Sequence, residues 1–199
     1  MISHIFGLFS DPVSQWKKLA QEPESHFVKR LVIFLFFAMV PPICFFIGTT
    51  QVGWSISGED PVRITAGSAI PLAVLFYLAL LGGVIFLGLM FDWMSKTYDA
   101  DSSPYKAVVF MFYATAPIYL ASVLAVYPVW WVDILAATAA LSYSIRLMYL
   151  GVPDMLKVPE DRGFLYASAG FMMALVYMVV VLTATVILWE FVATPVFTN

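Results

Sequence analysis

The sequence contains little charge, a single cysteine and only two histidines. Charged residues make up 12% of its 199 residues, about half the share found in an ordinary soluble domain. Cys44 alone can form neither an internal disulfide nor a cysteine-based metal site. The formal net charge is −3 and no basic run occurs, so the electrostatic footprint of a nucleic-acid-binding protein is missing. We therefore expect no nucleic-acid partner, no metal and no cofactor.

The residues that catalysis would need are also scarce. His4 and His26 both precede the first long apolar run, and neither has the spacing of a helical metal site or a serine or cysteine partner in a triad pattern. Ionisable residues are nearly absent from the interiors of the long apolar runs, where ion paths and proton relays require them. We predict that the protein is not an enzyme and has no catalytic residues.

Long apolar runs dominate the sequence, and 62% of its residues are hydrophobic. A helix needs about 20 apolar residues to cross a bilayer, and no signal-peptide pattern precedes the first run. The pattern therefore predicts an all-α integral membrane protein with five transmembrane helices, followed by a non-cytoplasmic tail at 192–199. The expected spans, which together form a membrane domain over residues 27–191, are 27–54, 70–91, 107–127, 129–150 and 164–189.

Prolines and a glycine interrupt three of these runs. Pro41 and Pro42 remove two backbone donors from the middle of the first run, so the first span is expected to bend near mid-membrane. The other expected kinks and breaks are at Pro117, inside the third span, and at Gly151 and Pro153, which are expected to stop the fourth helix.

Residues 1–26 form a leader before the first span. The Asp11-Pro12 pair is typical of a helix N-cap followed by the first helical position. We expect a short interfacial amphipathic helix, anchored by Trp16 at headgroup level. Lys17 and Lys18 would each gain about 1 kcal/mol from an anionic leaflet. The alternative is a disordered polar leader.

The distribution of basic residues predicts the orientation in the membrane. With five spans, the leader and the second and fourth loops share one side, and the other side holds only Arg63. Such a bias places the basic side in the cytoplasm, so the N-terminus is expected there and the C-terminus on the opposite side. The basic residues of the expected cytoplasmic side are Lys17, Lys18, Lys29, Arg30, Lys96, Lys106, Arg146, Lys157 and Arg162.

A group of polar residues is expected at the outer rim of the bundle. Asp133, near the outer end of the fourth span, shares a helical face with small residues that allow close helix packing. Glu190, at the outer end of the fifth span, is expected at a similar depth, and two such carboxylates can bind a cation or share a proton. The alternative, which the sequence favours, is that they are solvated and that the other polar residues cap a kinked helix. The candidate outer-rim residues are Thr49, Thr50, Gln51, Asp133 and Glu190.

Four stretches of the sequence are similar to a known family. They run from Pro42 to Trp54, from Leu72 to Tyr77, from Tyr127 to Trp130 and from Tyr149 to Pro153. Together they resemble the bacterial YohC-like inner-membrane proteins of the Yip domain family. The resemblance implies a five-span bundle in the bacterial cytoplasmic (inner) membrane, with a cytoplasmic N-terminus and a periplasmic C-terminus.

The leader departs from the eukaryotic members of that family, which include Rab/Ypt interactors. Those members are characterised by a long cytoplasmic N-terminal region with an Asp-Leu-Tyr-Gly-Pro motif, which is missing here. Rab binding is therefore not implied for this chain, and the resemblance implies a fold and a location without a settled activity.

Three classes of function fit these observations. The first is a non-enzymatic membrane-organising protein that binds membrane lipids, protein partners or further copies of itself, and the scarcity of ionisable groups favours it. The second is a small transporter or channel, although an odd number of spans makes an inverted repeat within one chain awkward. The third is a lipid scramblase that acts through a groove beside the kinked first span.

Overall fold

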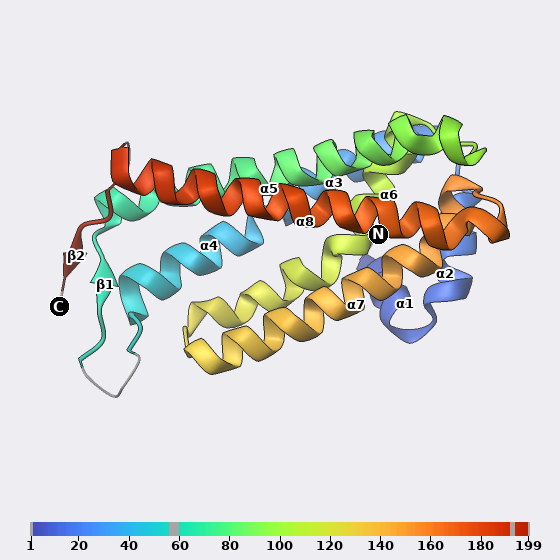
Figure 1. The fold of residues 1–199 in the computed structure, drawn as a ribbon. Coiled ribbons are helices and arrows are strands. Elements are labelled where there is room, and N and C mark those ends of the chain that lie inside the picture. The colour runs from blue at the N-terminus through green and yellow to red at the C-terminus, as the bar shows by residue number, and fades with distance from the viewer. Residues whose placement is uncertain (1, 56–59, 192–193, 199) are drawn as a thin grey trace.

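Helices account for nearly all of the regular structure in the computed structural model, which describes residues 2–55, 60–191 and 194–198. Among these residues, five helical segments are long and apolar enough to cross a membrane, and the predicted all-α five-span architecture is confirmed (Figure 1). The two ends of the bundle are called here the leader end, where the N-terminal helices lie, and the tail end, where the C-terminal strand lies. The candidate spans are Val28–Val52, Ala66–Tyr98, Pro104–Val126, Trp130–Leu156 and Asp161–Phe191.

The spans are built from helices that are interrupted at several places. The elements are α1 (Ile2–Ser10), α2 (Pro12–Ala20), α3 (Glu24–Phe37), α4 (Val40–Ile47), the π-helix η1 (Gly48–Val52), β1 (Arg63–Ile64), α5 (Ala66–Ser95), the 3-10 helix η2 (Lys96–Tyr98), α6 (Pro104–Ala121), the 3-10 helix η3 (Ser122–Val126), α7 (Trp130–Leu156), α8 (Glu160–Phe191) and β2 (Phe197–Thr198).

The first span is broken where the sequence predicts a bend. Helix α3 ends at Phe37 and α4 begins at Val40, so only two residues separate them. Pro41 and Pro42 occupy the first turn of α4, where a helix does not need their missing N–H groups. The bend expected from the two prolines is therefore a short interruption between two helices.

The other predicted breaks differ from the structure. Helix α7 continues through Gly151 and Pro153 to Leu156, so the prediction that these two residues stop the helix is wrong. Pro153 lies in the last turn, where its missing N–H removes only one intrahelical bond before the left-handed Lys157 (φ 49°) ends the helix. Helix α6 is not broken at Pro117 and runs to Ala121, and the kink expected at Pro117 stays a prediction.

The leader contains two helices, and it packs into the bundle. The predicted N-cap is present, because the Asp11 side chain accepts a hydrogen bond from the backbone N–H of Ser14 at 3.2 Å. Trp16 is completely buried, so the predicted position of this side chain at the lipid headgroups is wrong. Its ring lies 5.4 Å from the ring of Phe110, measured between centroids. Lys17 and Lys18 are exposed, as an interfacial helix requires.

Gly151 explains why Trp16 can enter the core. A Cβ atom at this position would lie 2.6 Å from the Trp16 ring and 2.8 Å from the Phe110 ring. The apolar face of α2 therefore packs on a notch in α7 instead of on lipid. A second contact holds α1, because the Tyr143 hydroxyl donates a hydrogen bond to the carbonyl oxygen of Leu8 at 2.7 Å.

Helix α6 forms the centre of the bundle, and α8 lies at its edge. Helices α3, α5 and α7 all pack against α6, and every residue from Ala107 to Ala114 is buried. In contrast, no residue from Phe171 to Phe191 in α8 is buried. Figure 1 shows that α8 runs alongside α5, whereas α7 diverges from α8 toward the tail end.

The tail closes the end of the bundle opposite the leader. Strands β1 and β2 pair antiparallel, with Arg63 opposite Thr198 and Ile64 opposite Phe197. The pairing is extended by a hydrogen bond from the Thr65 N–H to the carbonyl oxygen of Val196 at 2.9 Å. The C-terminal strand and the segment between the first two spans therefore lie at the same end of the molecule (Figure 1).

Candidate functional site

A cavity of about 310 Å³ lies where α8 separates from the α6–α7 hairpin, and we call it the α8 cavity. Four helices contribute to it, and nearly all of its lining is apolar. Representative residues of the lining are Gly83 and Leu87 from α5, Met111 and Tyr119 from α6, Ser144 and Met148 from α7, and Phe171 and Tyr177 from α8. The cavity lies inside membrane-spanning segments, so bilayer lipid is the medium that surrounds it.

Two tyrosines attach α8 to α5 at different heights, one in the cavity lining and one nearer the leader end. The Tyr177 hydroxyl donates to the carbonyl oxygen of Ala79 at 2.6 Å, and a Cβ atom at Gly83 would lie 2.7 Å from the Tyr177 ring. Nearer the leader end, the Tyr166 hydroxyl donates to the carbonyl oxygen of Phe91. These contacts fix α8 to α5 and leave the space toward α6 and α7 unfilled.

One polar atom in the α8 cavity stands out. The Ser144 side chain is buried, with 6% of the residue exposed, and its Oγ has no hydrogen-bond partner among the described residues. The Thr115 hydroxyl, which also lines the cavity, donates to the carbonyl oxygen of Met111 at 2.8 Å. Buried polar groups are normally hydrogen-bonded, so the Ser144 hydroxyl is a donor available to a molecule in the cavity.

A second cavity, of about 490 Å³, lies at the tail end, and it tests how the predicted outer-rim residues are arranged. Thr49 and Asp133 both line it, together with Phe45, Ser122 and Trp189. Thr50, Gln51 and Glu190 are not part of its lining. The structure thus brings one threonine and one carboxylate of the predicted group together, and it does not place the two carboxylates in one cavity.

The predicted threonines bond within their own helix. The Thr49 hydroxyl donates to the carbonyl oxygen of Phe45 at 2.8 Å, and the Thr50 hydroxyl donates to that of Phe46 at 2.7 Å. Gln51 is exposed and contacts Thr50. Among the described residues, no three His, Cys, Asp or Glu side chains come together as a metal site. This arrangement supports a capping role for the threonines at the irregular end of the first span.

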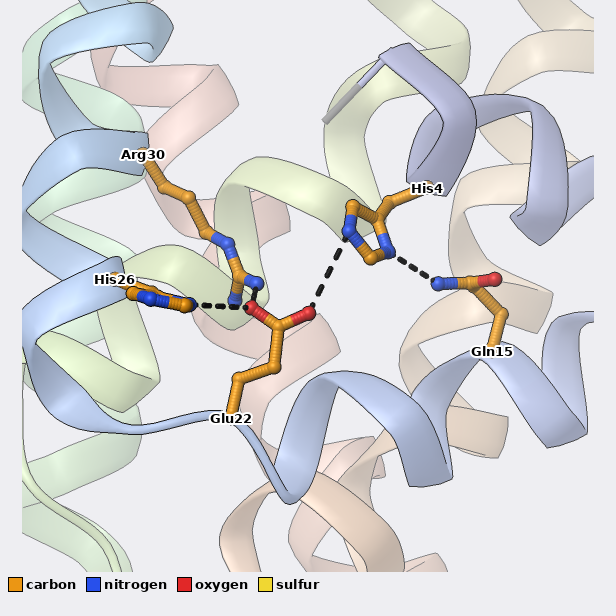
Figure 2. A network of polar contacts seen from close by, with 5 residues as sticks. All are labelled: His4, Gln15, Glu22, His26 and Arg30. Atoms are coloured by element: carbon orange, nitrogen blue, oxygen red, sulfur yellow. Dashed lines mark hydrogen bonds and ion pairs between the residues drawn. The ribbon is translucent and has the colours of Figure 1, made fainter.

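A polar network at the leader end was not expected from the sequence (Figure 2). Glu22 lies at its centre and forms an ion pair with Arg30, which is buried. The same carboxylate lies 3.5 Å from Nε2 of His4 and 3.3 Å from Nδ1 of His26. His4 in turn contacts Gln15, whose Nε2 lies 2.6 Å from its Nδ1.

This network connects four elements of the fold. His4 comes from α1, Gln15 from α2 and His26 and Arg30 from α3, and Arg30 also packs over the ring of Tyr113 in α6 at 5.7 Å. Burial and the nearby positive charges of Arg30 and Lys18 lower the pKa of His4. The spacing of Glu22, His26 and Arg30, each four residues apart, was a signal of one shared helical face.

The contacts of these residues described above join elements of the fold. Neither histidine contacts a serine or cysteine nucleophile in the hydrogen bonds that the structure describes. The two cavities described above are features that can bind a molecule, and both are mainly apolar.

Comparison with known proteins agrees with this architecture. The Yip1 domain model matches residues 6–183, from the leader to α8. The chain is 35% identical over 192 residues to the inner membrane protein YohC of Escherichia coli strain K12, covering 96% of this chain and 97% of that protein. The YohC protein of Escherichia coli O6:H1 strain CFT073 shows the same identity and coverage. No solved structure matches the chain. With residues 6–183 matched, the chain belongs to the Yip1 domain family.

Proposed function

We propose that this protein is a non-enzymatic, membrane-organising protein of the inner membrane that binds bilayer lipid in the α8 cavity. The observation that carries the proposal is the incomplete closure of the bundle along α8. A helix that packed fully against α5, α6 and α7 would bury residues along one face, yet α8 buries none from Phe171 onward. Lipid chains can therefore enter the cavity sideways from the bilayer.

The chemistry of the lining supports a lipid occupant. The α8 cavity is lined by leucine, methionine, alanine and aromatic side chains from four helices. Such a surface offers water few hydrogen-bond partners. Its volume of about 310 Å³ lies at the lower end of the range for small-molecule sites. A single acyl or prenyl chain fits these properties.

Location and orientation belong to the same proposal. The relatives are named inner membrane proteins, and the basic residues of this chain are concentrated at the leader end. We infer that the leader faces the cytoplasm and that the β1–β2 pair lies at the periplasmic surface.

A cavity-filling variant tests lipid binding. Ala174 lines the α8 cavity, so Ala174→Phe should displace the occupant. Ala139→Phe is the matched control, because Ala139 is exposed on α7 and lines neither cavity. We expect native mass spectrometry after mild detergent extraction to recover bound lipid with the unmodified protein and with A139F, and to recover much less with A174F. Equal recovery from all three would contradict the proposal.

The scramblase is the second candidate, because grooves do lie beside the broken first span. One cavity of about 310 Å³ is formed by α4 and α5, with Pro42, Ile43 and Tyr77 in its lining. A scramblase needs a polar path for the headgroup, whereas every lining residue of this groove except Tyr77 is apolar. We expect no acceleration of lipid exchange in a dithionite assay with labelled lipid in proteoliposomes, and rapid exchange would favour the scramblase instead.

A further inference from the structure

We propose that the α8 cavity is a specific site for a bilayer-soluble molecule that brings a carbonyl acceptor to mid-membrane depth, the chemistry of an isoprenoid quinone, and that the Ser144 hydroxyl is the donor that recognises it. This inference rests on the proposed function, because it specifies which lipid the same cavity takes. The unpaired hydroxyl, its depth and the side chains around it support this assignment.

The buried Ser144 hydroxyl lines a cavity, unlike the buried Tyr113 hydroxyl and the Trp16 ring N–H, which also have no hydrogen-bond partner among the described residues. Other hydroxyls on the spanning helices donate to the carbonyl oxygen four residues earlier: Ser142 to Thr138 at 2.8 Å, Thr138 to Ile134 at 2.8 Å, Thr183 to Val179 at 2.9 Å and Thr185 to Val181 at 2.8 Å. This back-bonding is the ordinary solution for a hydroxyl in a helix. Ser144, on the same helix as Ser142, is buried in the cavity lining without such a bond. Its hydroxyl is available to a ligand.

The depth of Ser144 selects the kind of acceptor. Ser144 lies between the two acidic residues of α7, eleven residues after Asp133 and ten before Asp154. At 1.5 Å per residue these separations are about 15–17 Å along the helix, and half of a hydrocarbon core is about 15 Å. Arg146 is exposed, packs over Tyr143 at 5.6 Å and does not line the cavity. The cavity that Ser144 lines is also lined by residues between Ala79 and Leu87 and between Phe171 and Leu182, which lie in the middle parts of α5 and α8. Ser144 thus lies in the central part of the spans, on the side of Arg146 and the leader.

Phospholipids do not offer a suitable acceptor at that depth. Their ester carbonyls lie near the headgroups, so only hydrocarbon tails would reach Ser144. A quinone ring dissolves in the hydrocarbon core and carries carbonyl oxygens that accept hydrogen bonds. A hydrogen-bond donor at this depth in an apolar cavity therefore suits a quinone. When a phospholipid chain is bound instead, the Ser144 hydroxyl stays unpaired.

The remaining lining suits a flat ring. Tyr119, Phe171 and Tyr177 supply aromatic surfaces, and Met111 and Met148 supply polarizable thioethers. Helices α5, α6, α7 and α8 all line the cavity. A ring can therefore lie between them while its prenyl chain extends toward the bilayer along α8.

Ligand-dependent thermal stabilisation of the full chain in detergent tests this inference. The probes are decylubiquinone and, separately, dioleoylphosphatidylglycerol, each titrated against the unmodified protein, Ser144→Ala and Ser142→Ala. We expect decylubiquinone to raise the unfolding temperature of the unmodified protein and of S142A. The affinity of S144A should be about fivefold weaker, the effect of losing one hydrogen bond. Without ligand, S144A should be at least as stable as the unmodified protein, because an unpaired buried hydroxyl is removed.

The other outcomes separate this inference from the proposed function. Stabilisation by the phospholipid and not by decylubiquinone would overturn the quinone assignment and leave lipid binding standing. Equal affinities of S144A and S142A for decylubiquinone would show that Ser144 is not the donor. No stabilisation by either probe would overturn both proposals for the α8 cavity.

Discussion

Glu22, in the turn between α2 and α3, forms an ion pair with Arg30, whose side chain is only 6% exposed. Arg30 lies two turns further along the chain and inside the packed leader end, where it also covers the ring of Tyr113. A buried guanidinium depends on its carboxylate partner, because an uncompensated charge in the interior is costly. The attachment of the leader to the bundle therefore depends on this pair.

Replacement of Glu22 by glutamine should destabilise the protein strongly. The variant keeps the shape of the side chain and removes the carboxylate that faces Arg30. Breaking a buried pair costs about 3–5 kcal/mol, and we expect about 2–3 kcal/mol here because the Glu22 side chain is 23% exposed. Glu190→Gln, at an exposed carboxylate on α8, is the control and should be neutral. Chemical denaturation in detergent measures both, and equal stabilities would contradict the assigned role of Glu22.

Acidification should loosen the leader. Burial and nearby positive charge lower the pKa of His4 below its usual value of 6.5, so the docked leader favours the neutral imidazole. This contribution to docking is fully present above pH 6.5 and is lost as the pH falls through the lowered pKa of the folded state. The groups that face His4 are Glu22, Gln15, Tyr113, Arg30 and Lys18.

Hydrogen exchange of α1 and α2 at pH 7.5 and pH 5.5 measures this effect. Exchange in these helices should rise at the lower pH beyond the change in intrinsic chemical rate, while exchange in the centre of α6 stays protected. His4→Gln removes the titrating ring and should reduce the difference between the two conditions. Unchanged protection of the leader at pH 5.5 would show that His4 does not control its docking.

Gly151→Ala should destabilise the contact between the leader and α7. The added methyl group would meet the rings of Trp16 and Phe110, both held in the core, so overpacking should cost about 1–3 kcal/mol. Gly67→Ala, in the first turn of α5 with nothing within 4 Å of the new atom, is the matched control and should be neutral or slightly stabilising. Thermal unfolding compares the two variants. If G151A were as stable as G67A, the notch in α7 would not be the docking site of Trp16.

A reporter fused after Asn199 tests the orientation. The pairing of β2 with β1 fixes the tail at the end opposite the leader, and the distribution of basic residues predicts a cytoplasmic leader. An alkaline phosphatase fusion should therefore be active and a fusion to green fluorescent protein dark. The reverse result would overturn the proposed orientation.

Local sequence rules located the spanning helices but not all of their ends, and they did not identify the packing partners of the helices. Asp11 and Pro12 identify the start of α2, and the pattern that follows identifies its apolar face. The same pattern fits a face that packs on lipid and one that packs on protein, since both surroundings are apolar. The difference is made by Gly151, 135 residues after Trp16, and a residue so distant cannot be paired with Trp16 from spacing alone.

The candidate site was predictable to a similar extent. Topology places Thr49, Asp133 and Glu190 at one end of the bundle, but the rotation of each helix about its axis decides which side chains meet. The structure gives Thr49 and Asp133 a shared cavity and leaves Glu190 outside it. In the sequence, Ser144 is one of the small residues on the helical face of Asp133, and no local pattern indicates the space around it, which arises from the separation of α8.

The attachment of α8 at both of its ends limits how it can move. Near its start, Tyr149 and Ser168 share a hydrogen bond of 2.8 Å, and beyond its end β2 is paired with β1. A helix attached at both ends cannot rotate away from the bundle about one end, as a helix attached at only one end can. The middle of α8 is held as well, because the Tyr177 hydroxyl bonds to Ala79 of α5, so a displacement of that segment toward the bilayer would require this hydrogen bond to open.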